Sequence, residues 1–180
     1  MDKAVAAVCY HIRRWSPVKG IRGLRPTVDA YLDIETTGLS PVFNDITVIG
    51  ICLAGGDTNR FTQLVGDEAT KANLLGVLSH ADTIYTYNGK RFDLPFIHCR
   101  LGIDLRDRFL HHDLMHDCWR HNLFGGFKAV ERRLGIPRQL RDIDGAEAVS
   151  LWWRYRVDDD REALGLLPEY NREDVVNLIA

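Results

Sequence analysis

Three strand-like segments follow one another early in this chain, and this order limits the folds that the rest can adopt. They cover residues 28–35, 45–55 and 58–64, are rich in β-branched and aromatic residues, and are separated by short pieces containing Gly, Pro, Asn and Asp. Strands joined by short connections pair as antiparallel neighbours, because a parallel return needs a long crossover. The chain therefore predicts a sheet that begins as three antiparallel strands.

The remainder alternates helix-like and strand-like segments before becoming wholly helical. Apolar residues at helical spacing cover residues 68–81 and 91–102, and short strand-like segments cover residues 82–88 and 108–114. Further helices are predicted at residues 114–123, 126–135, 145–156, 159–167 and 169–180. This succession predicts an α/β fold with one mixed sheet of five strands, three antiparallel and then parallel ones, flanked by helices.

The size of the chain fits one such domain. Its 180 residues are 46% hydrophobic, which suits a single core of ordinary size. Residues 1–27 are basic and interrupted by Gly and Pro, so we expect an extension followed by one domain at residues 28–180.

Composition also bears on the compartment and on partners. No secretory signal or apolar run of ~20 residues occurs. Four widely spaced cysteines without a C-x-x-C pair favour reduced thiols, and we expect a cytoplasmic protein that makes no membrane contact. The net charge of -2 gives no general attraction for polyanions, so local charge must hold any anionic substrate, and protein partners are not indicated.

Two acids stand at the end of the first strand-like segment. Side chains alternate along a strand, so Asp33 and Glu35 share one face. Two poorly solvated carboxylates raise each other's pKa unless a cation compensates them, and a hard divalent ion is the natural partner. The turn Thr36-Thr37-Gly38 that follows offers backbone NH groups to a phosphate or sugar. A solvated strand end is the alternative reading of the two acids.

Further acids lie later in the chain. Asp93 stands in the first turn of a predicted helix, where a helix-start charge is the simpler explanation. Tyr170 and Asp174 are four residues apart on one helix face, among apolar residues that indicate packing against the sheet. Surface decoration is the alternative for this pair.

Taken in order, these blocks resemble the three motifs of the DEDD superfamily of 3′-to-5′ exonucleases, which has a ribonuclease H-like fold. The matching blocks are Asp33-x-Glu35-Thr36-Thr37-Gly38, Asn88-x-x-x-Phe92-Asp93 and Tyr170-x-x-x-Asp174. They resemble the tyrosine subclass, because the position where the related subclass has histidine is Glu169 here. Residues 127–140 and 145–153 also resemble a group of compact predicted exonucleases.

The resemblance implies a set of metal ligands and a catalytic tyrosine. Asp33, Glu35, Asp93 and Asp174 would hold two divalent ions, Mg²⁺ or Mn²⁺. Tyr170 would orient the attacking water, since a phenol with an unperturbed pKa near ~10 is a poor base at neutral pH.

The resemblance also implies substrate contacts. Thr36, Thr37, Gly38 and Leu39 would hold the 3′-terminal nucleotide, with Asn88 and Phe92 at its sugar or base. A core position is the alternative for Phe92. Candidates for phosphate contacts are Lys90, Arg91, Lys128, Arg132, Arg133, Arg138 and Arg141.

The activity expected from this resemblance is metal-dependent 3′-to-5′ exonucleolytic hydrolysis of single-stranded or frayed DNA or RNA to nucleoside 5′-monophosphates. A two-metal mechanism suits in-line displacement at phosphorus. A structure-specific endonuclease on the same fold and a catalytically weak nucleic-acid-binding module are the alternatives. His112, His116, Cys118 and His121 offer an alternative, a zinc site, but their spacing matches no common zinc pattern. Asp113 is expected to cap the following helix.

Overall fold

The structure, a computed structural model, describes residues 27–55 and 58–180. Nearly all of the predicted extension, residues 1–27, lies outside the described residues, and so does Cys9. The division of the chain into an extension and a domain therefore stays a prediction.

The described residues form one five-stranded mixed sheet with the strand order β3-β2-β1-β4-β5. The strands are β1 (Asp29–Thr36), β2 (Ile46–Gly55), β3 (Thr58–Val65), β4 (Thr83–Thr86) and β5 (Leu110–Asp113). β1 pairs antiparallel with β2, and β2 pairs antiparallel with β3. β4 pairs parallel with β1, and β5 with β4. The predicted sheet is confirmed, and β1 is its central strand.

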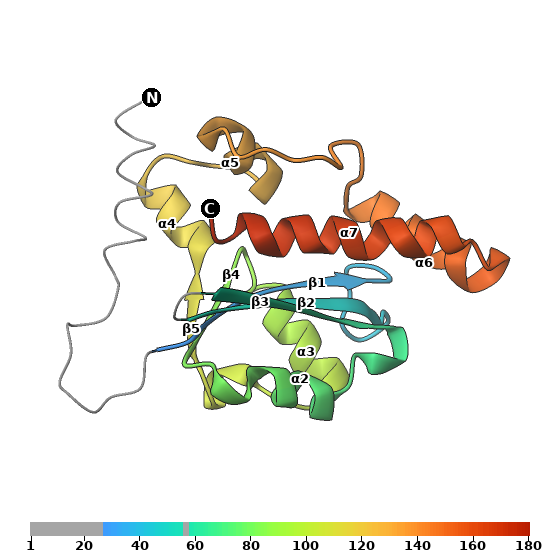
Figure 1. Ribbon diagram of the computed structural model, residues 1–180, viewed down its shortest axis with the longest axis horizontal. Coiled ribbons are helices and arrows are strands. Elements are labelled where there is room, and N and C mark those ends of the chain that lie inside the picture. The colour runs from blue at the N-terminus through green and yellow to red at the C-terminus, as the bar shows by residue number, and fades with distance from the viewer. Residues whose placement is uncertain (1–26, 56–57) are drawn as a thin grey trace.

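Helices cover both faces of this sheet (Figure 1). On one face lie α2 (Lys71–Val77) and α3 (Asp93–Leu101), and on the other lie α4 (Leu114–Arg120), α5 (Phe127–Leu134), α6 (Gly145–Asp158) and α7 (Arg161–Asn177). Short 3-10 turns cover Gly66–Glu68, Leu78–His80 and Leu105–Asp107. The result is a three-layer α/β fold.

The alternation of β1 divides its side chains between the two layers. Leu32 and Ile34 are buried in the core that includes Leu74 of α2 and Phe96 of α3. Tyr31 lies in the opposite core with Val175 of α7. Asp33 and Glu35 have the parity of Tyr31, so they point toward α7.

Helix α7 differs from the prediction. Two separate helices at residues 159–167 and 169–180 were expected, but one helix runs from Arg161 to Asn177 with Pro168 inside it. A proline lacks the N–H that would continue the helical hydrogen bonds. Here burial of Leu167 and Tyr170 on either side holds the helix against the sheet, and the carbonyl of Pro168 accepts a hydrogen bond from Gln63 Nε2 at 2.8 Å. Tertiary packing therefore overrides the break.

Two further expectations concern the environment of the protein. Cys52, Cys99 and Cys118, the cysteines among the described residues, form no disulfide with one another. No helix in the described part of the chain combines the length and the apolar character that crossing a bilayer requires.

Candidate active site

Three carboxylates meet between β1 and α7. Asp33, Glu35 and Asp174 each offer one oxygen, and these oxygens lie within 4.8 Å of one another. β1 supplies two of them because its alternate side chains face α7, and α7 supplies the third as it crosses the sheet (Figure 1). Asp33 and Asp174, which are 141 positions apart in the sequence, are thus brought together, as predicted.

Asp93 lies beside this trio rather than within it. Its carboxyl is 3% exposed at the start of α3, and its Oδ1 accepts a hydrogen bond from the backbone N of Ile34 at 3.2 Å. β4 pairs with β1 only as far as Tyr31, so this N–H has no strand partner on that side. Asp93 therefore accepts the hydrogen bond of a buried backbone N–H that has no strand partner. This N–H belongs to Ile34, the residue between the two acids of β1.

Burial and mutual repulsion raise the pKa of all four acids. Burial, followed by the charge of Asp174, raises the pKa of both Asp33 and Glu35 well above the ordinary range. Burial also raises the pKa of Asp93, to about 7, and the pKa of Asp174, although Arg138 opposes the latter. These carboxylates repel one another when all of them are ionised, and a divalent cation would relieve that repulsion. Carboxylate oxygens are also the ligands that such an ion prefers, so these residues fit it.

This repulsion predicts an unusual pH dependence of stability. Without divalent metal, lowering the pH from 8 to about 5 is expected to raise the free energy of unfolding by a few kcal/mol. A carboxyl whose folded-state pKa lies above its unfolded value, as for Asp93 at about 7, is destabilising when ionised and loses that penalty as the pH falls through the folded-state pKa. Urea denaturation in EDTA measures the effect, and Asp93→Asn should weaken it. Stability that falls over this range in wild type would contradict the prediction.

Asn171 orients Asp33. This fully buried side chain donates from Nδ2 to Asp33 Oδ2 at 3.0 Å and to the Asp33 carbonyl at 3.3 Å, while its Oδ1 accepts from Gln63 Nε2 at 3.0 Å. Gln63 Nε2 also donates to the carbonyl of Pro168, which can only accept, and this fixes which end of each amide faces which partner. Sequence reasoning missed Asn171, although its position three residues before Asp174 places it on the same helix face.

Gly50 leaves the room that Asn171 needs. It pairs with Asp33 across β1 and β2, and a Cβ built on it would lie 2.1 Å from Asn171 Oδ1 and 2.7 Å from Val175 Cγ2. Gly50→Ala is therefore expected to cost about 1–3 kcal/mol by overpacking and to lower any activity that depends on Asp33. Urea denaturation measures the cost.

A matched control for this substitution lies in α2. A Cβ on Gly76 would meet nothing within 4 Å, so Gly76→Ala should be neutral or stabilising by up to about 1 kcal/mol. Equal costs for the two substitutions would show that contact with Asn171 is not the cause.

Tyr170 is a buried phenol that stays protonated. Burial, followed by the charges of Asp174 and Glu35, raises its pKa, so it can donate a hydrogen bond at neutral pH but cannot act as a base. The Lys128 ammonium lies 4.6 Å from its ring centroid. A cavity of about 420 Å³ opens beside Tyr170, Asp33 and Asp174, with α5 as its other wall. There is room for a ligand next to the acids.

Arg138 faces inward, so the prediction that it contacts a phosphate at the surface is wrong. It is 7% exposed, and its guanidinium makes a bidentate pair with Glu131, with Nε and Nη2 donating at 3.0 and 2.9 Å. The same Nη2 also donates to Asp174 Oδ1. Arg138 therefore acts as a counter-ion to the acidic site and ties α5 to α7.

The predicted residues of the 3′-nucleotide pocket occupy the end of β1 and the turn that follows it. Thr36 Oγ1 donates to the carbonyl of Gly38 at 2.6 Å, and Thr37 Oγ1 accepts from Asp45 N at 2.9 Å. A Cβ on Gly38 would lie 2.7 Å from Asn44 Oδ1, so only glycine fits without a shift. Leu39 is 87% exposed and free to meet a ligand. The turn is held in one shape by its own hydrogen bonds, while the substrate role of these residues stays a prediction.

The loop between β4 and α3, which carries Asn88, is held by the side chain of Asp113. Its carboxylate accepts from Asn88 N at 2.8 Å and Lys90 N at 3.1 Å, and from Met115 N at 3.2 Å. The last bond makes Asp113 the N-cap of α4, which confirms that prediction. Asn88 itself has a positive φ of 62°.

Phe92 packs against the core, with its ring centroid 4.9 Å from that of Phe96. Its contact with a base stays a prediction.

The histidines near β5 have other partners than a metal. His111 Nε2 lies 3.0 Å from Thr86 Oγ1, and His112 pairs with Asp117. Within the part of the chain that the structure describes, the only grouping of candidate metal ligands is the acidic trio. A zinc site near residues 111–121 therefore has no geometric support.

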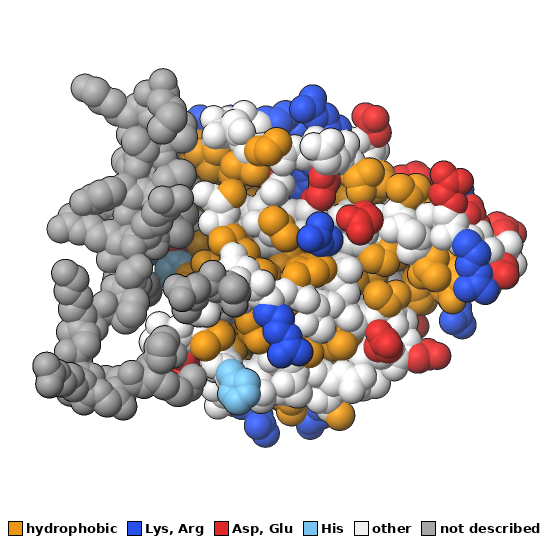
Figure 2. Space-filling view, in the orientation of Figure 1, with side chains coloured by type: hydrophobic (Ala, Val, Ile, Leu, Met, Phe, Trp, Pro, Cys, Tyr) orange, Lys and Arg blue, Asp and Glu red, His pale blue; other side chains and the backbone are white. Residues whose placement is uncertain are grey.

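Charges are mixed on the visible surface. Figure 2 shows Lys and Arg side chains interspersed with acidic and hydrophobic ones, without a broad basic area on this face. This agrees with the net charge of -2 and with the expectation that local groups hold any anionic ligand.

The mixed sheet has the strand order β3-β2-β1-β4-β5, and its central strand and α7 bring three carboxylates together. This arrangement is that of a ribonuclease H-like protein with an acidic site. Residues 30–180 match the family model RNase_H_2, described as RNase_H superfamily. The chain belongs to this superfamily, which supports a nuclease.

Individual relatives agree with this assignment. The chain is 32% identical over 168 residues to the uncharacterized protein YprB of Bacillus subtilis (strain 168), covering 83% of this chain but only 40% of that protein. It resembles the family B DNA polymerase of Pyrobaculum calidifontis with a TM-score of 0.61 and 17% identity, covering 85% of this chain and 24% of the polymerase. Brucella melitensis NrnC with bound Mg²⁺ matches with a TM-score of 0.45 and 19% identity, over 84% and 86% of the two chains. The polymerase likeness supports the fold, and the NrnC value is too low to add to it.

Proposed function

We propose that this protein is a metal-dependent 3′-to-5′ exonuclease that acts on single-stranded or frayed DNA or RNA and releases nucleoside 5′-monophosphates. The observation that carries the proposal is the approach of Asp33, Glu35 and Asp174 to within 4.8 Å of one another, one helical turn from Tyr170. Membership of the RNase_H superfamily supports the nuclease part, and the resemblance of the three sequence motifs supports the 3′-to-5′ direction.

The acids would hold the metal ions. Asp33, Glu35 and Asp174 supply hard oxygens from the trio, with Asp93 beside them, and Mg²⁺ or Mn²⁺ suits such a set. Two bound ions would supply activation of water and stabilisation of the departing O3′ oxygen.

The other residues of the site would position the substrate and water. The protonated hydroxyl of Tyr170 can orient a water without removing its proton. Asn171 keeps the Asp33 carboxylate in place, and Thr37 and Leu39, in the turn after β1, would contact the terminal nucleotide. These side chains would therefore orient the water, the substrate and the Asp33 carboxylate, and the bound cations would offset the negative charge of the acids.

The test uses 5′-labelled single-stranded DNA and RNA incubated with Mg²⁺ or Mn²⁺. We expect a ladder that shortens from the 3′ end, release of nucleoside 5′-monophosphates, and no products with EDTA or with Asp174→Asn. Asp107→Asn removes an exposed acid from the loop after α3 and should leave the ladder unchanged. An Asp174→Asn ladder equal to that of wild type would reject the proposal.

Circular single-stranded DNA separates the alternatives. An exonuclease leaves it intact, whereas an endonuclease on the same fold opens it. Binding of oligonucleotides without metal-stimulated cleavage of any substrate would instead indicate a binding module.

A further inference from the structure

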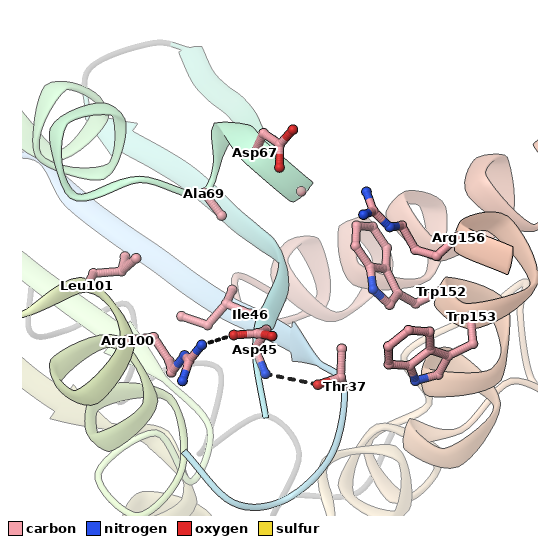
Figure 3. A pocket seen from close by; sticks show the side chains of 11 residues that line it. Thr37, Asp45, Ile46, Asp67, Ala69, Arg100, Leu101, Trp152, Trp153 and Arg156 are labelled. Atoms are coloured by element: carbon pink, nitrogen blue, oxygen red, sulfur yellow. Dashed lines mark hydrogen bonds and ion pairs between the residues drawn. The ribbon is translucent and has the colours of Figure 1, made fainter. Parts of the chain in front are cut away.

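A second cavity lies between the turn that follows β1 and helix α6. Its volume is about 380 Å³, within the range of ligand sites, and it is bounded by α6, the end of α3 and the start of β2. Figure 3 shows Trp152, Trp153 and Arg156 on one wall and Thr37, Asp45 and Arg100 opposite them. None of the predicted catalytic residues lines it.

Consecutive tryptophans give this cavity its aromatic wall. Trp152 is 8% exposed and packs in the core between the sheet and α6, whereas Trp153, one position further along the helix, is 50% exposed. Trp152 already has Tyr155 and the guanidinium of Arg156 as neighbours, at 5.8 Å in each case. Within the described residues Trp153 has no such ring or cation partner, so its indole presents an open face to the cavity.

The opposite wall includes the turn that follows the acids of β1. Thr37 follows Glu35 by two residues. Its backbone N donates a hydrogen bond to the carbonyl of Asp45, and its Oγ1 accepts one from Asp45 N, at 2.9 Å each. Asp45 in turn pairs with Arg100 at the end of α3 (Figure 3). This pair neutralises Asp45. The remaining charged side chains of the lining are Asp67 and, on the tryptophan wall, the exposed Arg156, which can offer its guanidinium to an anionic group.

We propose that this cavity binds an unpaired nucleotide of the strand whose end lies at the acidic site, with its base stacked on Trp153 and its phosphate held by Arg156. The proposal rests on the proposed function. Aromatic stacking accepts any base, and a guanidinium is suited to phosphate geometry. A base that is paired within a duplex cannot place its face on Trp153. The cavity therefore selects single-stranded nucleic acid.

The test is the dissociation constant of a fluorescein-labelled oligothymidylate, measured by anisotropy in EDTA so that metal-dependent cleavage cannot occur. Trp153→Ala and Arg156→Ala are each expected to raise Kd about 10-fold, as losing one stacked base or one phosphate contact does. Trp153→Phe should retain most of the affinity because a ring remains. The matched control is Arg154→Ala on the same helix, because Arg154 pairs with Asp160 and does not line the cavity.

A second substrate separates this site from the cleavage site. The p-nitrophenyl ester of thymidine 5′-monophosphate spans only the bond that is broken, so its rate of hydrolysis should be unchanged by Trp153→Ala. The same substitution should reduce the preference for a single-stranded over a double-stranded oligonucleotide.

The outcomes are distinct. Unchanged Kd values for both variants, including the case in which the cavity instead binds a protein, would overturn this inference, as would an equal fall in ester hydrolysis. If wild type binds the oligonucleotide but cleaves neither substrate, the proposed function fails. A raised Kd for Trp153→Ala would then still support the nucleotide site.

Discussion

Asp33→Asn is expected to lower nuclease activity about 10²–10³-fold while leaving the metal-free protein at least as stable as wild type at pH 8. The rate falls because one oxygen ligand is lost from the trio, and removing a single electrostatic contributor from a catalytic site typically costs about 10²–10³-fold. Stability does not fall because burial and the charges of Asp174 and Glu35 hold the pKa of Asp33 well above its usual range, so the ionised side chain is itself a burden. An amide of the same shape removes that burden.

Initial rates on a labelled oligonucleotide and urea denaturation in EDTA measure the two effects. Adding Mg²⁺ should stabilise wild type more than the variant, since a ligand that binds the folded state raises its stability. Asp107→Asn, an exposed acid outside the cluster, serves as control and should change neither quantity appreciably. A variant that keeps a tenth of the wild-type rate, or that is clearly less stable in EDTA, would contradict the role given to Asp33.

Arg138→Met is expected to destabilise the fold by about 3–5 kcal/mol, the cost of leaving a buried charge without its partner. Arg138 and Glu131 are 7% and 2% exposed, and the substitution removes both hydrogen bonds of their bidentate pair. It also takes the counter-ion from Asp174, whose pKa should rise further because Arg138 opposes the effect of burial more strongly than Lys128 does. Thermal or urea denaturation at pH 7.5 measures the loss.

Two comparisons identify the cause of that loss. Glu131→Leu combined with Arg138→Met removes the unpaired charge and should recover part of the stability, although Asn177 Nδ2 then loses its bond to Glu131. Arg154→Met breaks the more exposed pair with Asp160 and should cost clearly less than Arg138→Met. Equal losses for Arg138→Met and Arg154→Met would show that burial of the ion pair does not determine its contribution.

Local sequence patterns were sufficient for the sheet and for the first half of the site. Short connections between the first three strands left antiparallel pairing as the simplest order, and β1 to β3 follow it. Period-two alternation placed Asp33 and Glu35 on one face whatever covered that face. Asp113 was predictable as a helix cap because capping depends on residues only two or three positions away.

Patterns failed where a distant partner decided the outcome. Pro168 indicated an interruption between two helices, yet contacts of Leu167 and Tyr170 with the sheet keep α7 continuous. Arginine is a common phosphate ligand at protein surfaces, which is why Arg138 was a candidate. It points inward because it donates hydrogen bonds to Glu131 and Asp174. Nothing local distinguishes Asn171 from an ordinary helix residue, because its partners Gln63 and Asp33 lie more than 100 positions away.

The sequence by itself determined the order of the strands, the shared face of Asp33 and Glu35, and the resemblance of three motifs to those of an exonuclease. The resemblance also implied Asp93 and Asp174 as partners of these acids. Only the tertiary structure decided that Asp174 lies within the trio, that Asp93 accepts a hydrogen bond from the backbone of β1 beside it, and that Trp153 lines a cavity next to the turn after β1. The physical reason is range. Alternation, capping and turn preferences act over a few residues, whereas the pKa values and contacts of the site arise from the burial of charges that meet only when α7 packs across the sheet.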